Sequence, residues 1–339
     1  MNEKLRETVF RLCMADGTSG DETGARETAA REFAPFAETS SDTLGNLTAE
    51  IGDMGSKTHI LVDAHLDQIG LIVTGIDKSG FINVDGCGGM DRRVLPGSAV
   101  TVYGKEKLYG VVCFMPPHFT GSKEDEVQEA GRMTVDIGCT CEEAKRLVKP
   151  GDRILFSTEP KALLGGRISA PALDNRSSVA ALVRCVQILS GKRLSCHVTF
   201  LCSTREEVGG QGAVTGAYIA NPTAAIAVDV GFASQPGVRP EQCGKLGGGP
   251  MIGFAPVLNR AMSEKLVSVA EKLGIPYSRD AMGGDTGTNS ENIAASRAGV
   301  PTGLVSIPER NMHTPAEIVD LQDVENTAQL IAEYIAEAE

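Results

Sequence analysis

The chain has 339 residues, a formal net charge of -12 and an apolar fraction of 42%. The negative charge argues against a general nucleic-acid-binding protein, which needs a basic surface. No apolar run reaches the roughly 18 residues of a membrane-spanning helix. The N-terminus is a charged helix start without the apolar core of a signal peptide. We therefore expect a cytoplasmic protein with no nucleic-acid or membrane partner.

The first part of the chain, which we place at residues 1–71, predicts two helices followed by two strands. Residues 2–14 and 21–37 have helical patterns, and the loop Asp16-Gly17-Thr18-Ser19-Gly20 between them can end one helix and cap the next. Residues 43–51 predict a turn and a strand. Residues 57–64 predict a second strand, which ends at His65-Leu66-Asp67.

Residues 72–164 have a different sequence pattern from residues 1–71, because helical periodicity almost disappears there. Short β-rich segments are separated by Gly, Pro and Asp turns, and one short helix is predicted at residues 141–148. The predicted strands cover residues 81–84, 99–103, 107–114, 133–137 and 153–157. This pattern predicts a small, mostly antiparallel β domain inserted into a larger one.

Alternation of helices and strands returns in residues 165–339. The predicted helices are 178–190, 261–273, 290–298 and 321–336, and the predicted strands are 197–204, 224–230 and 302–307. Alternation of this kind is typical of an α/β fold with a mixed central sheet and helices on both faces.

The strand at 197–204 leads directly into two adjacent carboxylates, Glu206 and Glu207, and then into the turn Gly209-Gly210. In an open α/β sheet, ligands gather beyond the carboxyl ends of the strands. Successive side chains at a strand end point in different directions, so one glutamate can hold a metal ion while the other faces a substrate. Such a carboxylate suits metal-assisted hydrolysis as the general base. The alternative is a pair of solvated surface glutamates.

Other polar residues stand at comparable positions. His65 and Asp67 follow a predicted strand, Asp229 lies near the end of another, His313 follows a third, and Asp174 precedes an apolar helix. For Asp174 the alternative is a helix N-cap, and for the others it is a solvated loop residue. Taken together, five nitrogen and oxygen ligands of this mixture fit two divalent ions that share one carboxylate. Imidazole combined with carboxylate suits zinc or cobalt rather than magnesium.

In this order the residues resemble the dinuclear-metal aminopeptidases of the glutamyl/tetrahedral aminopeptidase family. The resemblance extends nearly end to end and includes the length of the β insertion. It is carried by the motifs Gly17-Thr18-Ser19-Gly20, Asp42-Thr43-Leu44-Gly45-Asn46, His65-Leu66-Asp67-Gln68-Ile69-Gly70, Asp174-Asn175-Arg176, Glu206-Glu207-Val208-Gly209, Asp229, Gly299-Val300-Pro301 and His313-Thr314-Pro315.

The resemblance implies a zinc-exopeptidase-like fold and a metal-dependent aminopeptidase that acts on short peptides. It implies two zinc or cobalt ions per subunit, bridged by Asp174, with four further ligands divided between them: His65, Glu207, Asp229 and His313. Glu206 would be the general base, and Asp67 would orient His65. The resemblance also implies that the inserted domain forms dimers, which assemble into a tetrahedral shell of twelve subunits.

Three departures from the family pattern concern the walls of the site and remove no predicted ligand. Many relatives have Asp where this chain has Asn175, Gly-Thr-Asp where it has Gly287-Thr288-Asn289, and Thr-His-Ala where it has Val230-Gly231-Phe232-Ala233.

Two alternatives stay open from the sequence. An N-acyl amino-acid deacylase or a carboxypeptidase-like hydrolase would need a cationic residue for a substrate carboxylate, and Arg176 and Arg205 lie beside the motifs. The other alternative is an inactive, shell-forming binding protein. A glycosidase is disfavoured, because adjacent glutamates do not by themselves flank a sugar bond and the chain has no Trp for stacking.

Overall fold

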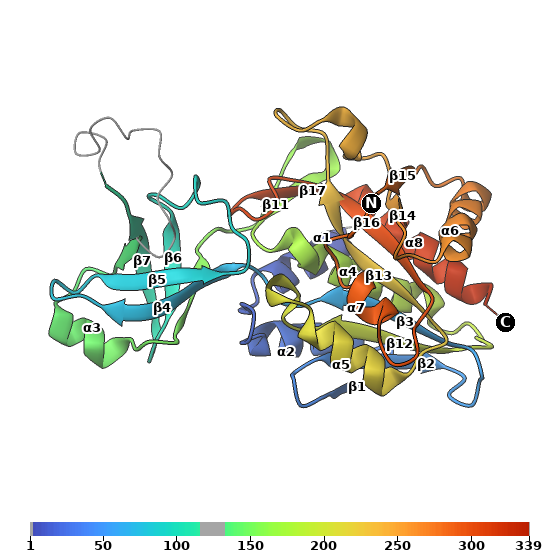
Figure 1. Ribbon diagram of the computed structural model, residues 1–339, viewed down its shortest axis with the longest axis horizontal. Helices are drawn as coiled ribbons and strands as arrows, with labels where there is room; N and C mark the ends of the chain where they lie inside the picture. Colours follow the sequence, from blue (N-terminus) through green and yellow to red (C-terminus); the bar gives the residue numbers. More distant parts are fainter. Residues whose placement is uncertain (1–2, 116–132, 339) are drawn as a thin grey trace.

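The computed structural model describes residues 3–115 and 133–338. A large sheet covered by helices forms the main body, and a small β-barrel projects from one end of it (Figure 1). The expected α/β fold, with a mixed central sheet and helices on both faces, is confirmed. Within the described ranges, no helix combines the length and apolar character that crossing a membrane would need.

Four parallel strands form the centre of the large sheet. They are β12 (His197–Ser203), β3 (His59–His65), β13 (Ala224–Phe232) and β16 (Thr302–Arg310), which lie side by side in that order. Their carboxyl ends therefore open on the same edge of the sheet, where ligands bind in folds of this kind.

Shorter strands extend the sheet on both sides of this centre. Most of them pair in antiparallel fashion: β1 (Glu38–Ser41), β2 (Leu47–Gly52), β10 (Lys161–Ala162), β11 (Arg167–Ala170), β14 (Met251–Phe254) and β17 (Glu317–Asp320). The strand β15 (Ser278–Ala281) pairs with β14 in parallel. This last pair continues the sheet beyond β16 and becomes important for the cavity described below.

Helices cover the two faces of the sheet unequally. One face packs against α1 (Glu3–Cys13), α2 (Thr23–Phe33), α4 (Leu173–Leu189), α6 (Arg260–Leu273) and α8 (Leu321–Ala336), and the other packs against α5 (Gln211–Ala220) and α7 (Ser290–Ala294). The apolar alternation of β3 explains both layers, because Ile60 and Val62 belong to the first core while Leu61 belongs to the second.

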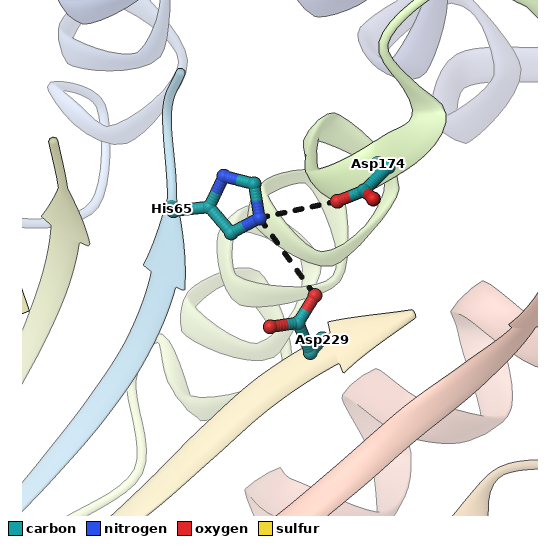
Figure 2. Close-up of side chains that lie close together, drawn as sticks. All are labelled: His65, Asp174 and Asp229. Carbon is teal, nitrogen blue, oxygen red and sulfur yellow. Dashed lines mark ion pairs between the residues drawn. The ribbon is translucent and has the colours of Figure 1, made fainter. Parts of the chain in front are cut away.

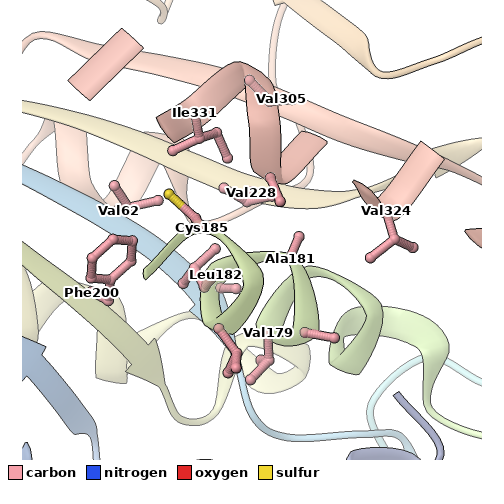
Figure 3. Packing of buried hydrophobic residues seen from close by; sticks show 14 of the residues in the cluster. Val62, Val179, Ala181, Leu182, Cys185, Phe200, Val228, Val305, Val324 and Ile331 are labelled. Atoms are coloured by element: carbon pink, nitrogen blue, oxygen red, sulfur yellow. The ribbon is translucent and has the colours of Figure 1, made fainter. Parts of the chain in front are cut away.

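The larger core is centred on α4, which is apolar on most of its surface. Figure 3 shows Ala181, Leu182 and Cys185 of this helix packed between the strands and α8. They meet Val62 and Phe200 from β3 and β12, and all five side chains are at most 1% exposed. Burial of a large apolar side chain contributes about 1.5–3 kcal/mol, so this layer fixes α4 against the sheet.

The projecting barrel is a separate closed β-structure with its own core. Its strands, in spatial order, are β4 (Gly70–Ile76), β5 (Ile82–Cys87), β8 (Thr134–Asp136), β7 (Lys107–Cys113), β6 (Ala99–Tyr103) and β9 (Arg153–Phe156). The helix α3 (Cys141–Leu147) starts at a capping box made by Thr140 and Glu143. Tyr103 and Lys107 of the barrel bind the carboxylate of Asp16 at 2.6 and 2.7 Å, which ties the barrel to the main body.

Several elements differ from those expected from the sequence. The helix expected at 178–190 begins at Leu173, although Asp174 and Asn175 depart from helical backbone angles. The strand expected to end at residue 307 continues to Arg310 despite Pro308, because Glu309 and Arg310 pair with β17. The helix expected at 290–298 ends at Ala294. The helix α5 and the strands β1, β4, β10, β11, β14, β15 and β17 were not predicted.

Candidate active site

The five predicted ligands lie together at the carboxyl edge of the parallel strands. His65 is the last residue of β3, Asp229 lies in β13, and Glu207 lies in the 3-10 helix Glu206–Val208 directly after β12. Asp174 is at the start of α4, and His313 follows β16. The turn after the glutamates requires glycine, because Gly209 and Gly210 have φ angles of 123° and 74°.

His65, Asp174 and Asp229 form the first candidate metal-ligand group (Figure 2). Nε2 of His65 lies 3.1 Å from Oδ1 of Asp174 and 3.8 Å from Oδ1 of Asp229. Nδ1 of the same ring lies 3.0 Å from the backbone oxygen of Asp67. Because a carbonyl oxygen only accepts hydrogen bonds, Nδ1 carries the proton and leaves the lone pair of Nε2 available for a metal ion.

Asp174, Glu207 and His313 form the second candidate group. Nε2 of His313 lies 3.2 Å from Oδ2 of Asp174 and 3.4 Å from Oε1 of Glu207. The two oxygens of Asp174 therefore face different groups: Oδ1 faces His65 and Oδ2 faces His313. A carboxylate in this position can bridge two ions.

Two oxygens of these groups have no hydrogen-bonding role in the described protein. Oδ1 of Asp174 and Oε1 of Glu207 are buried and accept no hydrogen bond of suitable geometry, although each faces a histidine nitrogen. Buried polar atoms are normally paired, so these two need another partner. Mixed imidazole and carboxylate donors fit a divalent ion such as zinc.

Asp67, expected to orient His65, also holds the loop that carries the two glutamates. Its carboxylate accepts hydrogen bonds from the backbone N–H groups of Glu206 and Glu207 at 2.9 and 3.1 Å, and from the hydroxyl of Ser19 at 2.6 Å. Burial alone would raise the pKa of Asp67, but its contact with His65 and these hydrogen bonds hold the pKa below its usual value. The side chain is therefore an ionised acceptor beneath the site.

Glu317 is a residue of the site that the sequence analysis missed. Its buried carboxylate accepts hydrogen bonds from the backbone N–H groups of Asp174 and His313, each at 3.1 Å. Glu317 therefore positions two residues of the second candidate group, Asp174 and His313. The sequence offered one signal for this role: Glu317 stands four residues after His313. It also begins a strand, β17, that was not predicted.

Glu206 points into the cavity beside the two groups and makes no side-chain hydrogen bond in the described residues. Its Oε2 lies 4.0 Å from Nε2 of His65. Burial, together with the neighbouring carboxylates Glu207, Asp174 and Asp67, raises the pKa of Glu206 to about 7, against a lowering by His65. A carboxyl group with a pKa near neutrality can both take and return a proton.

The site opens into a cavity of about 1080 Å³. Two of the departures from the family pattern form parts of its wall, namely the segments 230–232 and 287–288. Asn175 and Asn289 are buried behind it and donate hydrogen bonds to Val228 and to Asp63.

The two arginines beside the motifs are not placed to hold a substrate. Arg176 is fully buried and donates to the backbone oxygens of the segment 12–17 at 2.8–3.3 Å. Arg205 does not line the cavity either. The cationic group that a deacylase or carboxypeptidase would need is therefore not provided by these two residues.

Comparison with known proteins agrees with this arrangement of residues. The profile of the M42 glutamyl aminopeptidase family matches residues 45–330. The chain belongs to this family. The lysyl aminopeptidase of Pyrococcus furiosus is 31% identical over 338 residues, which cover 98% of this chain and 96% of that protein. As an M42 peptidase, the chain is an aminopeptidase, a hydrolase of peptides, and the family is metal-dependent.

Solved structures of M42 peptidases superpose on the whole fold. The TET aminopeptidase from a marine sediment archaeon of the Thaumarchaeota has a TM-score of 0.94 at 29% identity, covering 99% of this chain and 97% of that one. The TET1 peptidase of Pyrococcus horikoshii has a TM-score of 0.87 at 33% identity, covering 99% and 100%. That protein can assemble into a tetrahedron or a large octahedral shell.

Proposed function

We propose that this M42 peptidase holds two divalent ions, zinc or cobalt, and releases N-terminal residues from short peptides. His65 and Asp229 would hold one ion, Glu207 and His313 the other, and Asp174 would bridge them. The observation that carries the proposal is that the two oxygens of Asp174 face different histidines. Oδ1 lies 3.1 Å from Nε2 of His65, and Oδ2 lies 3.2 Å from Nε2 of His313. The unpartnered buried oxygens of Asp174 and Glu207 support it.

When bound, such ions polarise the scissile carbonyl and make hydroxide available at neutral pH. Glu206 takes the proton from the attacking water and later delivers it to the leaving amine. Asp67 keeps Glu206 in place through the backbone hydrogen bond of 2.9 Å. The position of Glu206 at the cavity wall, with 16% of its side chain exposed, supports this role, because the water and the leaving amine must both reach its carboxylate.

The test is hydrolysis of aminoacyl-anilides and short peptides by chelator-stripped protein, before and after zinc or cobalt is added. Release of free N-terminal residues should return with the metal and should be absent for acetylated substrates. Glu206→Gln should lower kcat by at least about 100-fold while two ions per chain stay bound. Activity restricted to acylated amino acids would instead identify a deacylase. Near-normal turnover by Glu206→Gln with both ions bound would exclude Glu206 as the base.

For assembly, we propose that the inserted segment 72–164 pairs two subunits and that the dimers build a dodecamer. Four apolar side chains of this segment, Tyr109, Phe114, Met115 and Leu164, leave more than half of their surface exposed. Exposed large apolar groups mark a protein–protein contact where they form one contiguous patch, which is the arrangement that we propose here. Tyr109→Glu combined with Phe114→Glu should lower the mass measured by light scattering. An unchanged mass would place the contact elsewhere.

A further inference from the structure

The cavity extends along the sheet, away from the candidate metal-ligand groups, as far as Asp280. Register connects the two ends of the cavity: Asp229 of β13 lies opposite Ser306 of β16, and Ser306 lies opposite Met251 of β14. Met251 in turn lies opposite Ser278 of β15, and Asp280 is two residues further along that strand. Because side chains alternate along a strand, Asp229 and Asp280 are on the same face of the sheet.

Asp280 lies three strands away from Asp229, and its carboxylate lines the same cavity. Neighbouring strands are about 4.8 Å apart, so the two strands are roughly 14 Å apart. The wall between them is largely apolar: Met251, Leu304 and Met282 line it. Gly253, opposite Asp280, is covered by Leu304 and Leu258, whose atoms lie 3.0 Å from the position of a Cβ there, so Leu304 forms the surface of the wall at this level.

Within residues 3–115 and 133–338, the carboxylate of Asp280 has no counter-ion. No salt bridge or side-chain hydrogen bond involves it among the described residues. Its neighbour Arg279 points to the other face of the strand, where it binds Glu264 at 2.9 Å and lies over the ring of Phe254. Burial raises the pKa of Asp280, which is the cost of leaving a partly buried carboxylate unpaired.

We infer that this region binds the side chain of the substrate's N-terminal residue and selects a long basic one, lysine or arginine. The inference rests on the proposed peptide hydrolysis at the same site. With the scissile carbonyl at the ligand groups, the aliphatic stem lies along Met251 and Leu304, and the cationic end reaches Asp280. Lysine suits this shape because a flexible four-carbon stem carries its charge. Shorter side chains stop before the carboxylate.

Arg239 also lines the cavity and would favour an acidic substrate residue if it dominated. Its guanidinium is exposed, and Glu241 follows two residues later in the same wall. Exposed charges are screened by water, whereas a partly buried one acts more strongly on a bound ion. The geometry therefore favours Asp280 as the group that sets the preference.

The test compares kcat/KM of the zinc-loaded enzyme on p-nitroanilides of lysine, ornithine, norleucine and glutamate. The wild type should prefer lysine to norleucine, which has a similar stem without the charge, and ornithine should fall between them. Asp280→Asn should lower the lysine-to-norleucine ratio of kcat/KM about 10- to 100-fold, with most of the loss falling on the lysine substrate. Asp280→Lys should shift the preference to glutamate.

Asp285→Asn is the matched control, because Asp285 is an exposed carboxylate of the same cavity and its loss changes the net charge equally. Equal effects of the two Asn variants, or a wild-type enzyme indifferent to the charge of the side chain, would overturn the inference. Calorimetric binding of lysinamide and norleucinamide gives a second readout and should follow the same ratio. If norleucine and every other anilide were left intact by the wild type, the proposed peptidase function would itself fail.

Discussion

The carboxylate of Asp67 accepts a hydrogen bond from the backbone N–H of Glu206, with 2.9 Å between Oδ1 and the nitrogen. A residue expected to orient a histidine thus also fixes the proposed base. Its other oxygen accepts from Ser19 and from the next backbone N–H, so no acceptor position of the side chain faces the solvent.

Asp67→Asn should therefore impair both the base and the ligands. The amide can accept through one oxygen only, and its NH₂ group would face a backbone N–H. We expect kcat and metal affinity each to fall about 10- to 100-fold, the usual cost of losing a group that orients ligands. Steady-state kinetics and zinc titration check this. Ser19→Ala, which removes one donor but keeps the carboxylate, is the control and should have a smaller effect.

Removal of single ligands should distinguish the two metal positions. Asp174→Ala removes the carboxylate common to both groups, so the affinity for both ions should fall at least about 10-fold. Asp229→Ala removes a ligand of the first group alone and should leave one ion bound with little change. Metal content after equilibrium dialysis gives the answer. Equal stoichiometry in the two variants would contradict a bridging Asp174.

Arg176→Lys should destabilise the protein without altering its substrate class. The guanidinium is fully buried and satisfies backbone carbonyls of the segment 12–17, and an ammonium cannot reach all of them. We expect the free energy of unfolding to fall by about 2–4 kcal/mol, measured by urea denaturation. The ratio of rates on free and acetylated substrates should stay the same. A shift toward acetylated substrates would give Arg176 a binding role.

His59 should make the protein more sensitive to acid. Its ring stacks on His197 with centroids 3.9 Å apart, and burial together with the charge of His197 lowers the pKa of His59 from 6.5 to about 4. Between these two values the unfolded chain binds a proton that the folded protein does not, so stability falls as the pH decreases from 6.5 to 4.

His59→Gln should remove this part of the acid sensitivity. Between pH 7 and pH 4.5 the free energy of unfolding should fall for both proteins. Because the imidazole is partly exposed, we expect this fall to be smaller in the variant by only about 1 kcal/mol. Urea denaturation of the metal-free proteins at both pH values measures the difference, and comparing the two proteins cancels the titration of shared groups. Identical pH dependence would show that His59 binds its proton equally in both states.

The sequence predicted residues that the structure brings together as candidate metal ligands, because strand ends with acidic residues next to them leave a pattern in the chain. Glu317 left none: its role is to accept two backbone N–H groups, and any buried carboxylate near a strand start can do so. Asp280 was not recognised either, since its distance from Asp229 depends on β14 and β15 joining the sheet beside β16. Spacing along one strand does not contain that information.

Local sequence also explains the missed elements. The helix α5 contains Gly212 and Gly216 and the β-branched Val214, Thr215 and Ile219, which weaken a helical signal. Packing requires those glycines, because a Cβ at position 216 would overlap Leu201 of β12. Tertiary contact, rather than helix propensity, thus places α5 against the sheet.

The wide separation of the ligands along the chain affects how the protein matures. His65 precedes the barrel, whereas His313 follows β16, so the second group is complete only after residue 313 has been synthesised. A growing chain, or a fragment cut before Met312, could hold the first group but would lack the second. Under the proposed mechanism, which uses both groups, a chain that has not yet reached His313 cannot hydrolyse neighbouring nascent proteins.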